Sequence, residues 1–216
     1  NEYPLYHYNW VQNNLKKVDK ASNGRIGYIY IPDMGPEGLN EFSRYFYPQL
    51  DKEGLIIDDR ANGGGNVSPM ILERLSREPY RLTMRRGSAR IGTVPDAVQV
   101  GPKVCLINKY SASDGDLFPW GFRALGLGKL IGTRTWGGIV GISGSLPYMD
   151  GTDIRVPFFT SFDPKTGSWI IENHGVDPDI LIDNDPVKEW NGEDQQLDRA
   201  IQEVMKELQN RKPLPG

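Results

Sequence analysis

A serine in the middle of the chain stands where a nucleophile could be presented. In the segment NKYSASDGDLFPWGF (108–122), Ser111, Ser113 and Gly115 are spaced like the nucleophile elbow GxSxG, with serine in place of the first glycine. A serine between a strand and a helix exposes its hydroxyl at the helix N-terminus, where backbone N–H groups can hold an oxyanion. Ser113 and Asp116 also have the S-x-x-D spacing of a capping box. Taken alone, the local sequence favours the cap, and the two interpretations compete for one hydroxyl.

A glycine-rich turn lies upstream of this serine. In LIIDDRANGGGNVS (55–68), a predicted strand ends at Asp58 or Asp59, and three glycines, 63–65, lead into a predicted helix. Consecutive glycines allow several backbone N–H groups to point into one concavity, which attracts negative charge. A plain tight turn explains the same pattern. Phosphate binding is disfavoured, because GxxxxGK[ST] is absent and Ser68 stands where the third glycine of GxGxxG would be.

The third segment is WIIENHGVDPDILID (169–183), in which Glu172 follows an apolar run. His174 and the N-terminal His7 are the two histidines of the chain, and a lone histidine is more often hydrogen-bonded at the surface than catalytic. With two histidines and one cysteine we expect neither a metal-ligand cluster nor a cofactor. The downstream aspartates are interpreted as turn and cap residues, with a loose calcium site as the alternative; they are Asp177, Asp179, Asp183 and Asp185.

The composition excludes several classes of protein. The 216 residues carry a net charge of -3, and the tightest basic cluster, 81–86, is too small for a nucleic-acid footprint. A single cysteine, Cys105, excludes an internal disulfide framework, and its apolar neighbours predict a buried small side chain. No apolar run approaches the 18 or more residues of a membrane span. The chain opens with Asn1, so we expect a piece of a longer polypeptide, cytoplasmic unless its parent carries a signal peptide for the periplasm or secretion.

The elements that must position these segments follow from periodicity and turn residues. Strands are predicted at 25–32, 55–58, 81–84, 104–108 and 130–133, and helices at 9–20, 36–50, 68–77, 113–125 and 193–208. Residues 88–102 are predicted to be a loop-rich excursion, and 136–182 to be rich in β-structure. Three strand–turn–helix units predict an α/β fold with mostly parallel strands and a β-rich C-terminal part.

The motifs taken together, in this order, resemble a known family, although no single motif is specific enough to indicate it. The runs RIGYIYIPDM, DDRANGGGNVS, SASDGD, GTRTWGG and ENHGVDPDI resemble the tricorn protease branch of the C-terminal processing peptidases, from about Trp10 to Ile182. The resemblance implies a ClpP/crotonase-like core of repeated β-β-α units. Residues 1–24 would be a linker and helix leading into the core, and residues 25–216 the nucleophile-bearing half of a serine peptidase catalytic core.

The resemblance also implies roles for individual residues. Ser113 matches the nucleophile, and the backbone N–H of Asp114 would contribute to the oxyanion hole. Gly64 is expected to supply the second N–H, with Gly63, Gly65 and Gly115 as supporting positions. Glu172 matches the acidic member of a catalytic tetrad, and hydrolysis would run through an acyl-enzyme.

One departure from the family pattern limits the expected activity. In the family the general base is a histidine preceded by a serine, upstream of an intervening PDZ domain, and neither His7 nor His174 matches it. We therefore expect this chain alone to be close to inactive. The implied partners are a peptide or unfolded polypeptide substrate, the upstream PDZ-like and histidine-bearing segments, and further copies of the chain.

Two alternatives from other classes remain open. A pseudoprotease or peptide-binding module would keep the groove without the chemistry. A crotonase-type acyl-CoA enzyme would use the glycine-turn N–H groups without Ser113, although the chain shows no basic patch for the phosphates of CoA.

Overall fold

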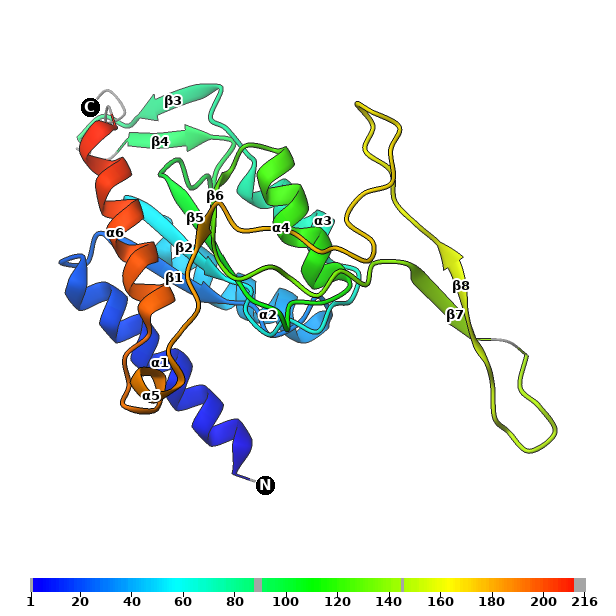
Figure 1. Cartoon of the computed structure of the whole chain (residues 1–216). Coiled ribbons are helices and arrows are strands. Elements are labelled where there is room, and N and C mark those ends of the chain that lie inside the picture. The colour runs from blue at the N-terminus through cyan, green and yellow to red at the C-terminus, as the bar shows by residue number, and fades with distance from the viewer. Residues whose placement is uncertain (1, 88–90, 145, 212–216) are drawn as a thin grey trace.

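A parallel sheet forms the centre of the computed structural model, which describes residues 2–87, 91–144 and 146–211 (Figure 1). Its strands lie in the order β1-β2-β5-β6-β9. Their bounds are β1 Ile26–Tyr30, β2 Gly54–Asp58, β5 Lys103–Ile107, β6 Gly128–Gly132 and β9 Ile180–Leu181. Each strand pairs in parallel with its neighbours, so the carboxyl ends meet at one edge of the sheet. The predicted α/β class is confirmed.

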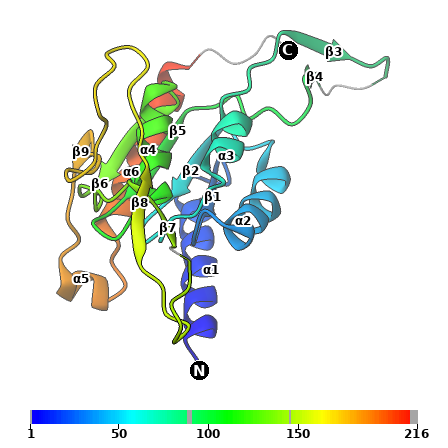
Figure 2. The ribbon, with the colours of Figure 1, turned by 90° about the vertical axis from the view of Figure 1, so that its right-hand side faces the viewer.

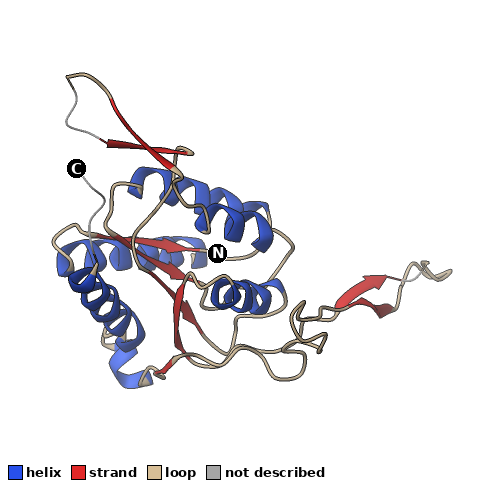
Figure 3. Cartoon of the chain, turned by 90° about the horizontal axis from the view of Figure 1, so that it is seen from above, coloured by secondary structure: helices blue, strands red, loops and turns tan. Residues whose placement is uncertain are grey.

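Helices cover both faces of this sheet (Figure 3). One face carries α1 (Tyr3–Ala21) and α6 (Gln195–Asn210), and the other carries α2 (Pro36–Phe46), α3 (Ser68–Leu75) and α4 (Asp114–Ala124). The 3-10 turn η1 (Tyr47–Gln49) follows α2, and the short helix α5 (Pro186–Trp190) precedes α6. Among the described residues, no helix combines the length and apolar character needed to cross a membrane.

The two covered faces explain why the central strands are apolar except at their ends. Successive side chains of a strand point to opposite faces, so both sets must be apolar when helices cover both. In β2, Leu55 and Ile57 join the apolar cluster under α2, α3 and α4, whereas Ile56 joins the cluster under α1 and α6. All five residues of β2 are buried.

Two hairpins lie outside the central sheet. β3 (Arg81–Met84) pairs with β4 (Ile91–Val94), and β7 (Gly141–Gly144) pairs with β8 (Arg155–Phe159). The β7–β8 hairpin and its loop form an arm that projects from the body (Figures 1 and 2). All five residues of β8 are exposed, as with Phe158 at 76%. The predicted β-rich region 136–182 therefore consists, in its described part, of this arm, an isolated bridge and the short β9.

Several predicted boundaries were wrong. The excursion 88–102 contains β4, a strand too short and too polar in its surroundings to stand out; residues 88–90 lie outside the described part. α1 begins at Tyr3 rather than at residue 9, and α5 was not predicted. α2 ends at Phe46 instead of residue 50, because Pro48 lacks the N–H that would continue the helical ladder.

Candidate active site

Ser113 occupies the sharp turn between β5 and α4. Its φ of 59° and ψ of -119° lie in a region that side-chain-bearing residues seldom adopt. Such a conformation costs on the order of 1–3 kcal/mol and persists only where surrounding contacts impose it. Two contacts hold the preceding residues: Ser111 Oγ donates to the carbonyl of Asp59 at 2.8 Å, and Ala112 N–H donates to the carbonyl of Asn62 at 2.9 Å. The turn is thus pinned to the chain that follows β2.

The hydroxyl of Ser113 does not cap α4. Ser113 occupies the N-cap position, but its side chain makes no capping hydrogen bond, and the residue is exposed. Asp116 Oδ1 accepts the N–H of Gly137 at 2.7 Å. The capping interpretation of the hydroxyl, which the local sequence favoured, is therefore wrong. Ser113 is thus exposed at the surface, with a hydroxyl that the helix terminus does not use.

The glycine turn packs directly against this serine. A Cβ added to Gly64 would lie 2.7 Å from Ser113 Cβ and 3.0 Å from Asp114 N, so only glycine permits the approach. Gly65, with φ of 152°, approaches the backbone of Met34 still more closely, since an added Cβ would lie 2.0 Å from the Met34 carbonyl oxygen. In α4, a Cβ on Gly115 would meet the carbonyl of Asn62 at 2.5 Å. The three glycines bring β2's following turn, β1's following turn and the start of α4 together.

The N–H groups near Ser113 differ in their availability. Gly64 N–H donates to Asn62 Oδ1 at 2.9 Å. Among the hydrogen bonds of the described residues, the N–H groups of Asp114, Gly63 and Gly65 have no acceptor. The carboxylate of Asp114 points elsewhere, accepting from Ser68 N–H at 3.0 Å and from Ser68 Oγ at 2.5 Å. Asp114 thereby ties α4 to α3 and leaves its own backbone N–H beside the serine.

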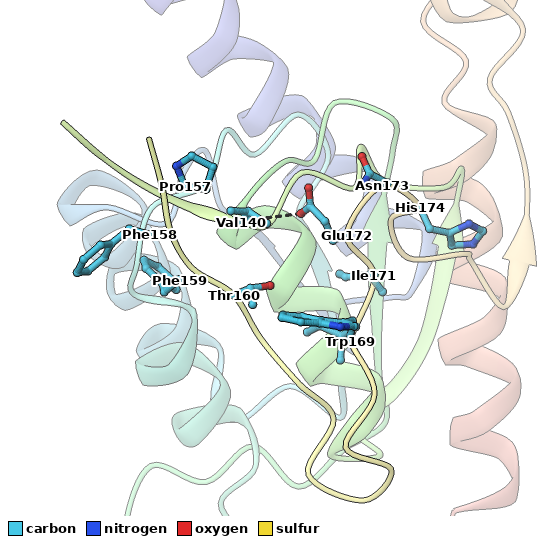
Figure 4. Close-up of a pocket in the computed structure, with 11 residues that line it drawn as sticks. Val140, Pro157, Phe158, Phe159, Thr160, Trp169, Ile171, Glu172, Asn173 and His174 are labelled. Atoms are coloured by element: carbon cyan, nitrogen blue, oxygen red, sulfur yellow. Dashed lines mark hydrogen bonds between the residues drawn. The ribbon is translucent and has the colours of Figure 1, made fainter. Parts of the chain in front are cut away.

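Glu172 lies on the loop 171–175 and is connected to the serine turn through residues 136–140. Its Oε2 accepts the N–H groups of Ile139 at 2.6 Å and Val140 at 2.9 Å (Figure 4). The same segment is bonded to the serine turn, because Trp136 N–H donates to the carbonyl of Ser111 at 2.9 Å. One short stretch of backbone therefore positions both predicted catalytic side chains.

A cavity of about 760 Å³ opens beside Glu172, between the base of the arm and residues 169–174 (Figure 4). Its apolar walls include Val140, Phe159 and Trp169. A carboxylate at the edge of an apolar hollow is a common arrangement of a binding site, in which a few polar groups orient a mostly apolar contact.

The two histidines are engaged elsewhere. His174 Nε2 lies 2.7 Å from Asp177 Oδ2, and its ring points away from Glu172 (Figure 4). His7 packs its ring against Trp10 and Tyr30 at centroid distances of 5.9 and 5.0 Å. The interpretation of His174 as a hydrogen-bonded surface residue is confirmed.

Sequence reasoning missed an ionic network on the opposite face of the sheet. The Arg60 guanidinium is 5% exposed and bonds both carboxylate oxygens of Asp58, with Nε–Oδ1 at 2.8 Å and Nη2–Oδ2 at 2.6 Å. It also bonds Asp194 Oδ1 at 2.9 Å, at the N-terminus of α6. The signal was the arginine two residues after Asp58, where a strand gives way to a loop. This network joins β2 to the last helix.

The chain is similar to known peptidases in sequence and in fold. The sequence pattern of Peptidase family S41 matches residues 25–182. The chain is 46% identical over 206 residues to the tricorn protease of Thermoplasma volcanium, covering 94% of this chain and 20% of that protein. The tricorn protease of Thermoplasma acidophilum is 45% identical over 202 residues, covering 93% and 19% respectively. A crystal structure of tricorn protease aligns with a TM-score of 0.87 and 44% identity, over 93% of this chain and 20% of that one. The chain thus spans about a fifth of the length of these relatives.

Proposed function

Because this chain belongs to peptidase family S41, we propose that it forms the nucleophile-bearing part of a serine peptidase that cleaves peptide bonds through an acyl-enzyme on Ser113. The observation that carries the proposal is the conformation of Ser113. With a strained φ of 59°, Ser113 is exposed at the start of α4, next to the glycine turn, and its hydroxyl makes no capping bond to the helix. A helix cap needs no such strain, whereas a presented nucleophile gains from it.

In the proposed reaction, Ser113 Oγ attacks the scissile carbonyl while a base removes its proton. The negative charge that develops on the carbonyl oxygen is held by the N–H of Asp114 and by one N–H of the 63–65 turn. Gly64 is the glycine whose contact with Ser113 is defined. Since its N–H donates to Asn62 Oδ1, it must exchange that acceptor for the oxyanion. The amine leaves with a proton from the protonated base, and water then hydrolyses the acyl-enzyme.

The proposed base is a histidine of another segment of the natural polypeptide. This is supported by the fifth of the relatives' length that the chain spans and by the engagement of His174 with Asp177. Glu172 would orient the incoming serine–histidine pair, using a carboxylate whose Oε2 is already fixed by two backbone N–H groups. Without that segment, we expect the isolated chain to lose several orders of magnitude in rate.

The substrate proposed is a peptide or unfolded polypeptide, since the glycine turn, the cavity beside Glu172 and the arm leave an open surface rather than a closed small-molecule pocket. As further proposals, the parent protein carries a PDZ-like segment, assembles from several copies and works in the cytoplasm.

A fluorophosphonate probe tests the nucleophile. The natural polypeptide containing this chain, its Ser113→Ala variant and a Ser76→Ala control are treated in parallel, and the modified residue is identified by mass spectrometry. Ser76 is a suitable control because its hydroxyl caps the exposed end of α3, bonding the carbonyl of Glu73. We expect labelling of the wild type and the control and none of Ser113→Ala. Labelling that survives Ser113→Ala refutes the assignment. A folded wild type that is never labelled favours a binding module without chemistry.

A further inference from the structure

Asp116 is the third residue of α4 and is fully buried, and the proposed reaction assigns it no part. Its spacing from Ser113 predicted a capping box, but the Ser113 hydroxyl makes no capping bond. A buried carboxylate is costly unless hydrogen bonds satisfy it, so the partners of Asp116 indicate its role. They lie largely in residues 135–140, which we call the connecting segment because it runs between the Ser113 turn and Glu172.

One side of the connecting segment is bonded to the residues that flank Ser113. Asp116 Oδ1 accepts the N–H of Gly137 at 2.7 Å. The carbonyl of Ser111 accepts the N–H of Trp136 at 2.9 Å. Asp116 follows Ser113 by three residues and Ser111 precedes it by two, so these two bonds hold the connecting segment on both sides of the serine in the chain.

The other side of the connecting segment is bonded to the loop that carries Glu172. Glu172 Oε2 accepts the N–H groups of Ile139 at 2.6 Å and Val140 at 2.9 Å. Thr135 N–H donates to the carbonyl of Val176 at 3.2 Å, and Val176 N–H donates to Thr135 Oγ1 at 2.8 Å. The connecting segment and the Glu172 loop are therefore joined at both ends of the segment.

Gly137 is bonded in both directions at once. Its N–H donates to Asp116, and its carbonyl accepts the N–H of Asn173, the residue after Glu172, at 2.7 Å. Its φ is 90°, and an added Cβ would lie 2.5 Å from the backbone nitrogen of Gly175, so glycine is required for this approach. A displacement of Gly137 would therefore be passed directly to the backbone beside Glu172.

The electrostatic surroundings of Asp116 agree with this geometry. Burial raises the pKa of its carboxyl group. Hydrogen-bond donors act in the opposite direction and favour the ionised form; they are the side chain of Thr135 and the backbone N–H groups of Gly137, Ser113 and Gly138. Only the bond from Gly137 has regular geometry, and Oδ2 has no regular partner among the described residues. All four donors belong either to the connecting segment or to Ser113 itself.

We propose that Asp116 is a positioning residue that fixes Glu172 relative to Ser113, because it holds Gly137 of the connecting segment against the first turn of α4. Asp116 touches no reacting atom. Its effect on catalysis rests on the function proposed above, whereas its anchoring of the connecting segment does not. Without the bond to Gly137, the connecting segment stays bonded to the Glu172 loop and depends on Trp136 for its hold on the serine turn.

Amide hydrogen exchange followed by mass spectrometry tests the anchoring independently of activity. The natural polypeptide is compared with its Asp116→Ala and Asp116→Asn variants, since asparagine keeps an oxygen that can accept from Gly137. We expect slow exchange of peptides covering 135–140 and 171–176 in the wild type and in Asp116→Asn, and faster exchange of both in Asp116→Ala.

The matched control for this experiment is Gln99→Ala. Gln99 is also buried and accepts a glycine N–H, that of Gly101 at 2.9 Å, but it precedes β5 at the opposite edge of the sheet. Its removal should leave both peptides unchanged. Unchanged exchange in a folded Asp116→Ala variant refutes the anchoring. A wild type whose connecting segment exchanges like an unprotected chain refutes it as well, and that measurement needs no variant to fold.

The rate of fluorophosphonate labelling tests the positioning role. We expect Asp116→Ala to label about ten- to a hundredfold more slowly than the wild type, as for a displaced catalytic group. Asp116→Asn should recover most of the rate, and Gln99→Ala should label like the wild type. An Asp116→Ala variant that labels at the wild-type rate refutes the role.

A double-mutant cycle with Glu172→Gln separates an action through Glu172 from a general disturbance of the site. If Asp116 acts through Glu172, Asp116→Ala slows the Glu172→Gln variant far less than it slows the wild type. If the two effects simply multiply, Asp116 acts independently of Glu172 and the proposal is wrong. Should Asp116→Ala fail to fold, Gly137→Ala displaces the same junction from its other side and replaces it in the cycle.

These outcomes distinguish the two proposals. A wild type that is never labelled contradicts the peptidase function, while the exchange experiment still decides whether Asp116 anchors the connecting segment. A labelled wild type whose connecting segment exchanges freely contradicts only the role of Asp116.

Discussion

Two consecutive carboxylates at the end of β2 are buried in opposite ways. Asp58 points toward α1 and α6, where it accepts bonds from Arg60 and from the hydroxyl of Tyr28 at 2.7 Å. The alternation of an extended chain places Asp59 on the other side, with Ile57, and its carboxyl oxygens have no hydrogen-bond partner among the described residues. Each residue is 0% exposed. The face with the complete ion network holds the fold together, and the face with the uncompensated carboxyl carries the strained serine.

The difference shows where the protein tolerates unfavourable groups. A buried ion costs several kcal/mol unless opposite charge and hydrogen bonds offset it, as Arg60 does for Asp58 and Asp194. On the other face, the positive φ of Ser113, the close approach of Gly64 and the orphaned oxygens of Asp59 lie together. Such groupings are typical of functional sites, and the ion network opposite supplies rigidity to the same strand end.

The largest expected effect on stability comes from removing the arginine of the buried ion network. Arg60→Met leaves Asp58 and Asp194 buried without their counter-charge and should lower the free energy of unfolding by about 3–5 kcal/mol. Urea denaturation followed by circular dichroism measures this. The control is Arg25→Met, which removes an exposed, solvent-screened pair with Glu53 and should change the free energy of unfolding far less. If both variants lost the same free energy of unfolding, the buried network around Arg60 would be no more stabilising than an exposed ion pair.

Gly64→Ala tests the face of the sheet that carries Ser113, because the added methyl group overlaps its neighbours. The new Cβ would lie 2.7 Å from both the carbonyl of Ala112 and Ser113 Cβ, so the two turns must separate. We expect labelling of Ser113 to be lost and stability to fall by about 1–3 kcal/mol. Gly126→Ala is the matched control, because Gly126 has a positive φ of 66° but no neighbour that a Cβ would meet within 4 Å. It should lose stability from the backbone alone and retain labelling.

The pH dependence of stability should have opposite signs on the two faces. The folded-state pKa of Asp59 is raised by burial and neighbouring carboxylates, so its stabilising contribution is complete below the unfolded pKa of about 3.9 and declines as pH rises toward the folded value. Burial alone would raise the pKa of Asp194, but Arg60 lowers it below its usual value, so that contribution is present at neutral pH and lost on acidification.

Denaturation across pH separates these two contributions. Asp59→Asn should abolish the fall in the free energy of unfolding as pH rises, which amounts to about 1.4 kcal/mol for each pH unit by which the pKa is raised. Asp194→Asn should abolish part of the fall in the free energy of unfolding on acidification. If Asp59→Asn follows the wild-type curve above pH 4, the carboxyl is ionised in the folded protein and the contrast between the faces disappears.

The smallest effect on stability is expected for Glu172→Gln. The amide oxygen can still accept from Ile139 and Val140, so stability should fall by about 1 kcal/mol or less, reflecting the loss of charge-assisted bonds. Labelling of Ser113 in the natural polypeptide should nevertheless fall, because the proposed orienting charge is gone. A Gln variant that labels at the wild-type rate would remove Glu172 from the proposed site.

The fold followed from the sequence where local pattern dominates. The apolar strands β1, β2 and β5 were predicted within one or two residues, because both faces of each are covered and few polar residues interrupt them. The short strand β4 and the helix α5 were missed, since neither has a periodic pattern long enough to distinguish it from a turn. The arm was predicted only as β-rich chain.

The sequence by itself determined the order of the strand–turn–helix units, the serine between β5 and α4, and the glycines that permit a close approach. It left the role of the Ser113 hydroxyl undecided, since a cap and a nucleophile share the same local spacing. The tertiary structure showed that this hydroxyl makes no capping bond, and it packed Gly64 against Ser113 and bonded Ser111 to Asp59. It also decided which carboxylate of the Asp58–Asp59 pair is compensated, because Arg60 finds Asp194 134 positions away. Local spacing governs backbone conformation, but the partners of a buried charge are chosen only when distant segments pack.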